Sequence, residues 1–253
     1  MANRTFAIGD IHGDLQALRK VMSKLPTLDA DDTVVFLGDY VDRGPQSKQV
    51  IDFIRTEYPK TTKAKIVALK GNHEDGWLRV ASGGWPEFIL PPTNGCLATL
   101  RSYTGALCLE GDTPTQEEMT QMSMGTFFPE DILDWMNALP NWYEDENAIY
   151  VHAGLIKENG VWLHPKDTTQ QALLLWLRTM EFFQAYDGKR AVCGHTSTDH
   201  LPPELSSYTP HDPYDMWVGG KNNSVLAIDT GCGKGGFLTA VELPSLVVYE
   251  SRS

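Results

Sequence analysis

The first eighty residues alternate short apolar runs with amphipathic segments. Arg4–Ile8, Thr33–Leu37 and Lys65–Leu69 are mostly apolar runs of strand length, which is typical of buried strands. Leu15–Leu25 and Ser47–Tyr58 carry apolar residues at intervals of three and four, which predicts helices. The resulting βαβαβ order predicts a mainly parallel sheet, with its loops gathered at the carboxyl ends of the strands.

The remainder of the chain is less regular. Pro129–Leu139 and Thr168–Tyr186 show helix-type spacing, and the second is the strongest later helical pattern. Segments 82–128 and 197–223 are rich in turn-forming residues, which predicts variable loops or a lid in which short helices could lie. The predicted strands of this half are Trp142–Tyr143, Ile149–Val151, Ala191–Cys193, Val225–Ile228, Phe237–Val241 and Leu246–Tyr249. No clear boundary interrupts the chain, so we expect one domain over residues 1–253.

Five polar clusters follow predicted strands. They are Gly9-Asp10-Ile11-His12-Gly13, Gly38-Asp39-Tyr40-Val41-Asp42-Arg43-Gly44, Gly71-Asn72-His73-Glu74, Val151-His152-Ala153-Gly154 and Cys193-Gly194-His195-Thr196. Loops that follow strands can bring residues distant in sequence to one rim of a sheet. A Gly-Asp pair after one strand is ordinary turn chemistry. Five clusters that combine carboxylate, imidazole and amide groups instead favour a site for Mn²⁺, Fe or Zn²⁺.

The charge balance restricts the partners. The 253 residues include 21 basic and 33 acidic ones, for a net charge of −12. An acidic chain offers no track for nucleic acid and no polybasic face for a membrane surface, so we expect neither partner. The four cysteines occur singly and no secretory signal is evident, which predicts a cytoplasmic protein with reduced thiols. Divalent ions would let such a chain attract an anion.

The motifs together resemble a known family. GDxHG, GDxxDRG and GNHE, followed by a histidine in HAG and another in GH, are similar to the phosphoprotein phosphatase family of metallophosphoesterases, above all its short bacterial and phage serine/threonine phosphatases. The resemblance implies an α/β calcineurin-like fold, a β-sandwich flanked by helices in α/β/β/α layers. It also implies two divalent ions, with Mn²⁺ preferred over Fe or Zn²⁺. A hydroxide bridging the ions would attack phosphoserine or phosphothreonine directly, and phosphotyrosine stays open.

The resemblance also implies roles for particular side chains. The implied metal ligands are Asp10, His12, Asp39, Asn72, His152 and His195, with Asp39 shared by both ions. His73 would protonate the leaving group and would be oriented by Asp42. Arg43 would bind the phosphoryl oxygens. Arg178, in a Trp-Leu-Arg sequence, would be the second phosphate-binding arginine, and Arg190 competes because it lies close to the last histidine in sequence.

Other functions remain open at this point. The nearest alternative is a dinucleoside polyphosphate hydrolase on the same scaffold; in that branch the position of Asp42 is often not acidic and GNHD replaces GNHE. Asp42 and Glu74 therefore favour the protein phosphatase. A non-catalytic binding protein should show a broken ligand set, and a nuclease would need a basic track. The glycine-rich run 230–236 lacks the order of a P-loop. The histidines expected outside the site are His164, His200 and His211.

Overall fold

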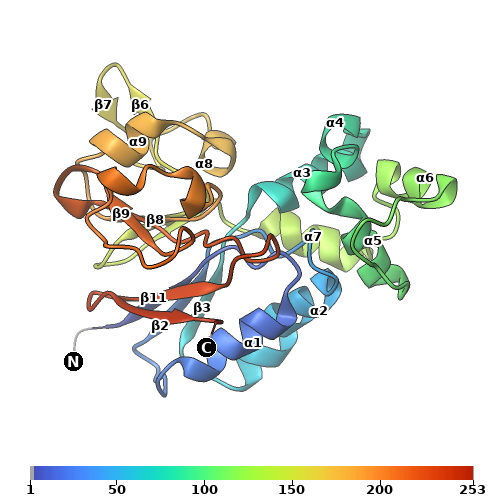
Figure 1. Cartoon of the computed structure of the whole chain (residues 1–253), viewed down its shortest axis with the longest axis horizontal. Helices are drawn as coiled ribbons and strands as arrows, with labels where there is room; N and C mark the ends of the chain where they lie inside the picture. The colour runs from blue at the N-terminus through green and yellow to red at the C-terminus, as the bar shows by residue number, and fades with distance from the viewer. Residues whose placement is uncertain (1–2, 253) are drawn as a thin grey trace.

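The structure, a computed structural model, describes residues 3–252. Two five-stranded mixed sheets pack against each other, and helices cover their outer faces (Figure 1). The layers are therefore α/β/β/α, as the family resemblance implies. Within the described residues, no helix combines the length and apolar character that a membrane crossing requires.

The first sheet contains the amino-terminal strands and the carboxyl-terminal hairpin. Its order is β12-β11-β1-β2-β3, with β1, β2 and β3 parallel and the other two pairings antiparallel. The bounds are β1 Thr5–Ile8, β2 Thr33–Phe36, β3 Lys65–Ala68, β11 Thr239–Leu243 and β12 Val247–Glu250. The parallel arrangement predicted for the first three strands is confirmed, so their carboxyl ends share one edge.

The second sheet has the order β4-β5-β8-β10-β9, with a parallel centre and antiparallel edge strands. The bounds are β4 Trp142–Glu144, β5 Ile149–Val151, β8 Ala191–Cys193, β9 Trp217–Gly219 and β10 Val225–Ala227. A separate hairpin pairs β6 Lys157–Glu158 with β7 Val161–Trp162. The sequence prediction missed the two-residue strands β6 and β7, and it missed β9 because that strand lies in the 197–223 segment, which is rich in turn-forming residues.

Alternate residues of each strand enter different cores. Ala7 and Val35 face the second sheet, whereas their neighbours Phe6 and Val34 face the helices. This is the two-residue period of a strand that is buried on both faces. The helices are α1 Leu15–Lys24, α2 Ser47–Asp52, α3 Asn72–Gly83, α4 Pro86–Ile89, α5 Cys96–Thr104, α6 Gln116–Met124, α7 Glu130–Ala138, α8 Leu173–Trp176 and α9 Met180–Ala185. Helices α1 to α7 contribute to the first sheet's outer core, and α8 and α9 pack on the second.

The single helix predicted over Thr168–Tyr186 is wrong. Two short helices, α8 and α9, occupy this stretch, and Leu177 and Thr179 between them are extended. The Thr179 hydroxyl accepts a hydrogen bond from the Glu181 N–H and so caps α9, a role for which threonine is well suited. Apolar spacing continues through the break because both helices bury side chains in the same core. The break leaves Arg178 outside either helix.

The 82–128 segment folds as three short helices, α4, α5 and α6, beside α3 (Figure 1). Arg101 of α5 links its parts: the guanidinium donates 2.8 Å to Glu118 Oε1 of α6 and 3.0 Å to the Leu107 carbonyl, and it also contacts Asp112. These contacts join the ends of a loop that has little core of its own.

We expect Arg101→Met to destabilise the protein at neutral pH. The Arg101 hydrogen bond and the Thr115 N–H lower the pKa of Glu118 to about 2. Because this pKa is lower in the folded chain than in the unfolded chain, the stabilisation is full above pH ~4.5 and is lost as the pH falls toward 2. The variant should melt about 2–4 °C below the wild type at pH 7 and much closer to it near pH 2. Arg19→Met, which breaks an exposed ion pair with Glu57, is the control. An equal deficit at both pH values would contradict the assignment.

Candidate functional site

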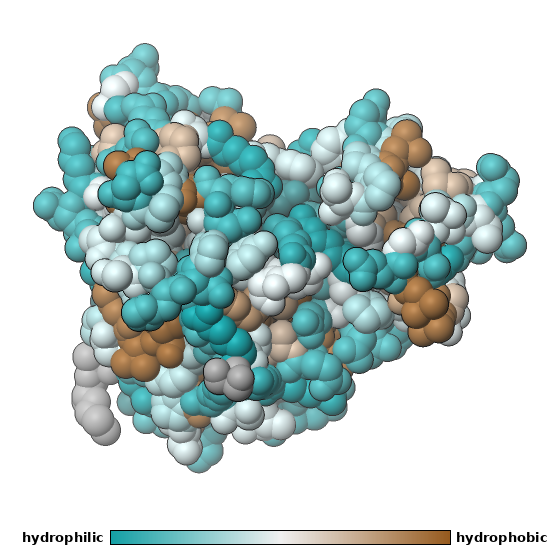
Figure 2. Space-filling model, viewed as in Figure 1, coloured by the Kyte–Doolittle hydropathy of each residue, from teal (hydrophilic) through white to brown (hydrophobic). Residues whose placement is uncertain are grey.

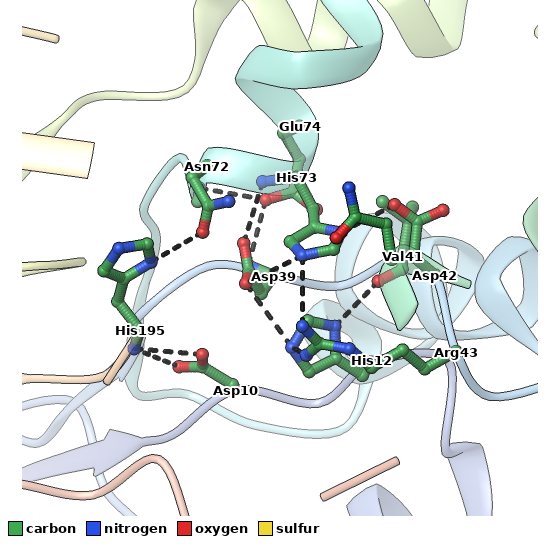
Figure 3. Close-up of polar contacts among 12 residues, drawn as sticks. Asp10, His12, Asp39, Val41, Asp42, Arg43, Asn72, His73, Glu74 and His195 are labelled. Atoms are coloured by element: carbon green, nitrogen blue, oxygen red, sulfur yellow. Dashed lines mark hydrogen bonds and ion pairs between the residues drawn. The ribbon is translucent and has the colours of Figure 1, made fainter. Parts of the chain in front are cut away.

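The five polar clusters meet at one edge of the two sheets. Each follows the carboxyl end of a strand: β1, β2, β3, β5 or β8. The six side chains implied as metal ligands lie together there, as do His73 and Asp42, and all eight are at most 5% exposed. Figure 3 shows Asp10, His12, Asn72 and His73 gathered around Asp39, with Asp42 on the far side of His73. Strands far apart in sequence thus supply one buried cluster of carboxylates, imidazoles and an amide.

Asp39 lies at the centre of this cluster. Its Oδ1 is 3.4 Å from His152 Nε2, and its Oδ2 is 3.4 Å from His12 Nε2. His73 Nε2 is 3.9 Å from the same Oδ2 (Figure 3). The two oxygens of one carboxylate therefore face imidazoles on opposite sides, which is the arrangement that a shared ligand between two ions requires.

The histidines are held in the orientation that leaves one ring nitrogen available. His12 Nδ1 lies 3.0 Å from the Val41 carbonyl and His152 Nδ1 lies 2.9 Å from the Leu37 carbonyl, so each Nδ1–H donates to the backbone. Each Nε2 is then an acceptor that points into the site. Burial lowers the pKa of both imidazoles and of His195, which favours the neutral form that binds a metal.

The second half of the cluster contains Asn72 and His195. Asn72 Oδ1 lies 2.7 Å from His195 Nδ1 and 3.0 Å from His152 Nε2. His195 Nε2 is buried and has no hydrogen-bond partner among the described residues. Burying a ring nitrogen without a hydrogen-bond partner lowers the stability of the fold. The backbone N–H of His195 donates to Asp10, 3.0 Å from Oδ2, and so joins the loop after β8 to the loop after β1.

The charges fit divalent ions. Burial, together with Asp229 and Asp39, raises the pKa of Asp10 well above its usual value. Burial alone would also raise the pKa of Asp39, but the imidazoles of His152, His73 and His12 hold that pKa well below its usual range. Donor atoms lie within 4.8 Å of one another in two groups: His12, Asp39 and His73, and Asp10, Asp39 and His152. Closely spaced buried carboxylates with neutral imidazoles are a donor set that hard or intermediate cations satisfy.

Asp42 and His73 form a hydrogen-bonded pair. Asp42 Oδ2 lies 2.6 Å from His73 Nδ1, so the ring turns its Nε2 toward the site (Figure 3). The other oxygen accepts from Trp77 Nε1 at 2.9 Å and from the Thr99 hydroxyl at 2.6 Å. Thr99 lies in α5, so the 82–128 segment helps to orient this pair. Sequence analysis missed Thr99 because no motif marks it.

The three candidate arginines differ in placement. The Arg43 guanidinium contacts His12 Nε2 and lies 3.4 Å from His73 Nε2, on one side of the cluster. Arg178 is exposed and makes no hydrogen bond or ion pair within residues 3–252. Burial and His152 are the larger causes of the lowered pKa of His195, and the nearby Arg178 charge lowers that pKa further. Arg190 precedes β8, whereas His195 follows its other end. A three-residue strand is about 10 Å long, so Arg190 stands at the wrong end.

Glu74 accepts hydrogen bonds from the backbone of the loop that carries Asp39. Its Oε2 accepts from the N–H groups of Asp39 and Gly71, each at 2.9 Å, and its Oε1 accepts from Tyr40 N–H at 2.8 Å. Burial and the Asp39 charge raise the pKa of Glu74 to about 8, and the three N–H donors oppose that rise. This carboxylate therefore joins the loop after β2 to the start of α3. Its role is structural, and the GNHE motif alone does not reveal it.

Five site residues adopt left-handed backbone. The φ angles are 46° at His12, 54° at Asp39, 71° at Asp42, 68° at Arg43 and 64° at His195. Residues with a β-carbon rarely adopt this conformation, and such strain gathers where function requires a particular geometry. The three histidines expected outside the site do lie outside it: His164 pairs with Glu144, His200 with Asp199, and the His211 N–H donates to Asp215.

Glu74→Gln should destabilise the fold although it changes no metal ligand. The glutamine amide would place its NH₂ against a backbone N–H that now has an acceptor, so at least one buried hydrogen bond is lost. We expect the free energy of unfolding to fall by about 1–3 kcal/mol. Urea unfolding of the metal-free protein at pH 9, above the pKa of Glu74, measures this loss, with Glu87→Gln on the exposed face of α4 as the matched control. Wild-type stability in Glu74→Gln would refute the anchoring role.

Comparison with known proteins places this site in a family. Residues 4–199 match the family model described as calcineurin-like phosphoesterase. A symmetrical bis(5'-nucleosyl)-tetraphosphatase of Dechloromonas aromatica is 27% identical over 97% of this chain and 95% of its own. Serine/threonine-protein phosphatase 2 of Escherichia coli is 32% identical over 31% of this chain and 38% of its own. The structure of a cold-active protein-tyrosine phosphatase from Shewanella shares the fold, with a TM-score of 0.53 at 18% identity over all of this chain and 81% of its own. The chain belongs to the calcineurin-like phosphoesterase family.

Proposed function

We propose that this phosphoesterase hydrolyses dinucleoside polyphosphates at a dinuclear metal site. The observation that supports this choice is the extent of the similarity to the symmetrical tetraphosphatases, which spans nearly the whole of both chains. The similarity to a serine/threonine phosphatase covers less than a third of this chain. The sequence motifs favour a protein phosphatase, and the comparisons support the alternative substrate better.

The first ion would be held by Asp10, His12 and Asp39, and the second by Asp39, Asn72, His152 and His195. The fit rests on the two faces of Asp39 and on Asn72 Oδ1, which lies 2.7 Å from His195 Nδ1 and 3.0 Å from His152 Nε2. When bound, two divalent ions, of which Mn²⁺ is the expected one, supply positive charge for the phosphate oxygens and activate water for attack. The six side chains keep these charges buried and fix their positions.

Arginine side chains would bind and orient the phosphate. Arg43 lies between His12 and His73 and can offer two parallel N–H groups to phosphate oxygens. Arg178 can approach the same phosphate from the α8–α9 break, because nothing in the described chain engages its guanidinium. We prefer Arg178 to Arg190 for this reason and because Arg190 lies at the far end of β8.

In this reaction, water adds to one of the two central phosphorus atoms, and the bond from that atom to the oxygen that bridges the two central phosphorus atoms breaks. The electron pair stays on that oxygen, so two nucleoside diphosphates leave and the protons of the water pass to the products and to solvent. The terminal ionisation of a phosphate has a pKa of about 6, so such a leaving group needs little help from an acid.

A phosphoprotein substrate is the second candidate, because of the Asp42–His73 pair. A serine or threonine alkoxide is nearly as basic as hydroxide and needs a proton as it departs. His73 Nε2, aimed into the site by Asp42, could supply it. The GNHE motif favours a phosphoprotein substrate, but the Glu74 side chain itself gives that substrate little support. Both of its oxygens accept hydrogen bonds from backbone N–H groups.

A substrate panel decides between the two candidates. The metal-stripped enzyme, reconstituted with Mn²⁺, should hydrolyse diadenosine tetraphosphate at least about tenfold more efficiently than a phosphoserine or phosphotyrosine peptide. p-Nitrophenyl phosphate serves as the reference for basal chemistry. Higher kcat/KM for a phosphopeptide would overturn the proposed substrate and leave the site assignment standing.

His73→Asn should separate the two kinds of leaving group. Loss of a general acid costs about 10²–10⁴ in rate where the leaving group is a poor one. We therefore expect that loss with a phosphoserine peptide and much less with diadenosine tetraphosphate or p-nitrophenyl phosphate. Metal content measured on the same samples is the control. Equal losses on all three substrates would mean that His73 positions phosphate rather than donating a proton.

A further inference from the structure

A cavity of about 760 Å³ adjoins the metal-site residues and has no role in the chemistry described above. One wall comes from the 82–128 segment and the other from the loop that follows β10. Arg43 lines the cavity at the end nearest the site. The volume is in the range of pockets that enclose a small ligand.

The loop after β10 brings Lys234 to the same end. Gly233 has a φ of 73°, and a β-carbon there would come within 2.8 Å of the His12 β-carbon, so the loop lies directly on a metal-site residue. Lys234, the next residue, lines the cavity. Its ammonium is 3.4 Å from Oδ2 of Asp229, which is fully buried. Asp229 thus fixes a cation beside the phosphate site.

The opposite wall is attached to Arg43. Gly95 has a φ of 75°, and its carbonyl accepts the Arg43 N–H at 3.2 Å. A β-carbon at Gly95 would come within 2.3 Å of the Arg43 nitrogen. The 82–128 segment therefore touches the backbone of the phosphate-binding arginine, and a ligand that contacts Arg43 also meets this wall.

Beyond Arg43 and Lys234 the lining of the cavity is mostly apolar, and its acidic members are Glu110 and Asp112. Ile89, Leu97 and Met122 line it, and at its rim Leu90 and Leu109 are 60% and 59% exposed. Figure 2 shows hydrophobic surface over the part of the molecule formed by α4, α5 and α6. Asp112, an acidic lining residue, already contacts Arg101. Exposed apolar side chains grouped around a cavity mark a binding surface.

We propose that this cavity binds one nucleoside diphosphate half of the substrate, with Lys234 on a phosphate beyond the one attacked and the base among the apolar side chains. Two cations at one end and a mostly apolar remainder match an anion joined to a flat, weakly polar ring. This inference rests on the proposed function, because it assigns the second half of the same substrate. It makes Lys234 a specificity residue that the sequence motifs leave without a role.

Lys234→Met tests the phosphate contact. Loss of a charge-assisted hydrogen bond should raise KM for diadenosine tetraphosphate about tenfold or more. Because the variant also leaves the buried Asp229 carboxylate without its partner, p-nitrophenyl phosphate, which has nothing beyond the attacked phosphate, is measured alongside, and the ratio of kcat/KM for the tetraphosphate to that for p-nitrophenyl phosphate should fall about tenfold. Lys221→Met, which removes an exposed lysine paired with Asp187, is the matched control. Unchanged KM for the tetraphosphate, or equal loss on both substrates, would overturn the assignment.

Cys108 provides a binding test that needs no turnover. It lines the cavity and is partly exposed, whereas Cys96, Cys193 and Cys232 are buried. ADP added to the metal-free protein should slow alkylation of Cys108 by N-ethylmaleimide, and ribose 5-phosphate, which lacks the base, should protect less. Cys108→Ser identifies the labelled site. Equal protection by both compounds, or none, would refute a nucleoside site.

The two tests distinguish a wrong assignment of the cavity from a wrong assignment of the substrate. Protection by ADP in an enzyme that does not cleave the tetraphosphate would support the nucleoside site and overturn the substrate. Cleavage of the tetraphosphate without protection, and with unchanged KM in Lys234→Met, would overturn the site and leave the substrate standing. Protection by a hydrophobic phosphopeptide but not by ADP would indicate a peptide groove and refute the nucleoside site.

Discussion

The buried carboxylate of Asp39 is the constraint around which the site is organised. Its two oxygens face imidazoles from different parts of the chain, so its position must be fixed in all directions. Glu74 fixes the Asp39 backbone from behind, and the His73 N–H donates to Asp39 Oδ1 at 3.0 Å. Helix α3, which carries both Glu74 and His73, therefore begins where the metal site needs it. One carboxylate thus couples the placement of β2, β3 and a helix.

The same constraint explains the unusual backbone around it. Five site residues occupy left-handed conformations that cost about 1–3 kcal/mol each. Hydrogen bonds between loops hold them there: His12 N–H donates to the Asp39 carbonyl at 2.8 Å, and Gly44 N–H to the His12 carbonyl at 2.9 Å. The cores on both faces of the first sheet keep the strands that carry these loops rigid. Stability stored in the sheets thus maintains a geometry that the loops alone would not adopt.

The sequence predicts those parts of the molecule that depend on neighbouring residues. Strand ends followed by Gly-Asp or Gly-Asn are local patterns, so the three parallel strands and the convergence of the polar clusters could be expected. The break between α8 and α9 could not, because apolar spacing runs through it and the carbonyl of Leu174 is engaged by Ala153 from another loop. Thr99 and the anchoring role of Glu74 were hidden for the same reason. Both depend on contacts across tens of residues.

Arg43 contacts both the candidate catalytic site and the segment that lines the cavity. Its guanidinium contacts His12 and His73, and its backbone N–H donates a hydrogen bond to the Gly95 carbonyl of the 82–128 segment. Thr99 of the same segment holds Asp42, which orients His73. A segment that looks variable in sequence is therefore attached both to Arg43, which we propose binds phosphate, and to the Asp42–His73 pair, which we propose supplies a proton. Changes in that segment would alter the cavity and the orientation of these residues together, so substrate choice and catalytic geometry are linked in this protein through α5 and the turn before it.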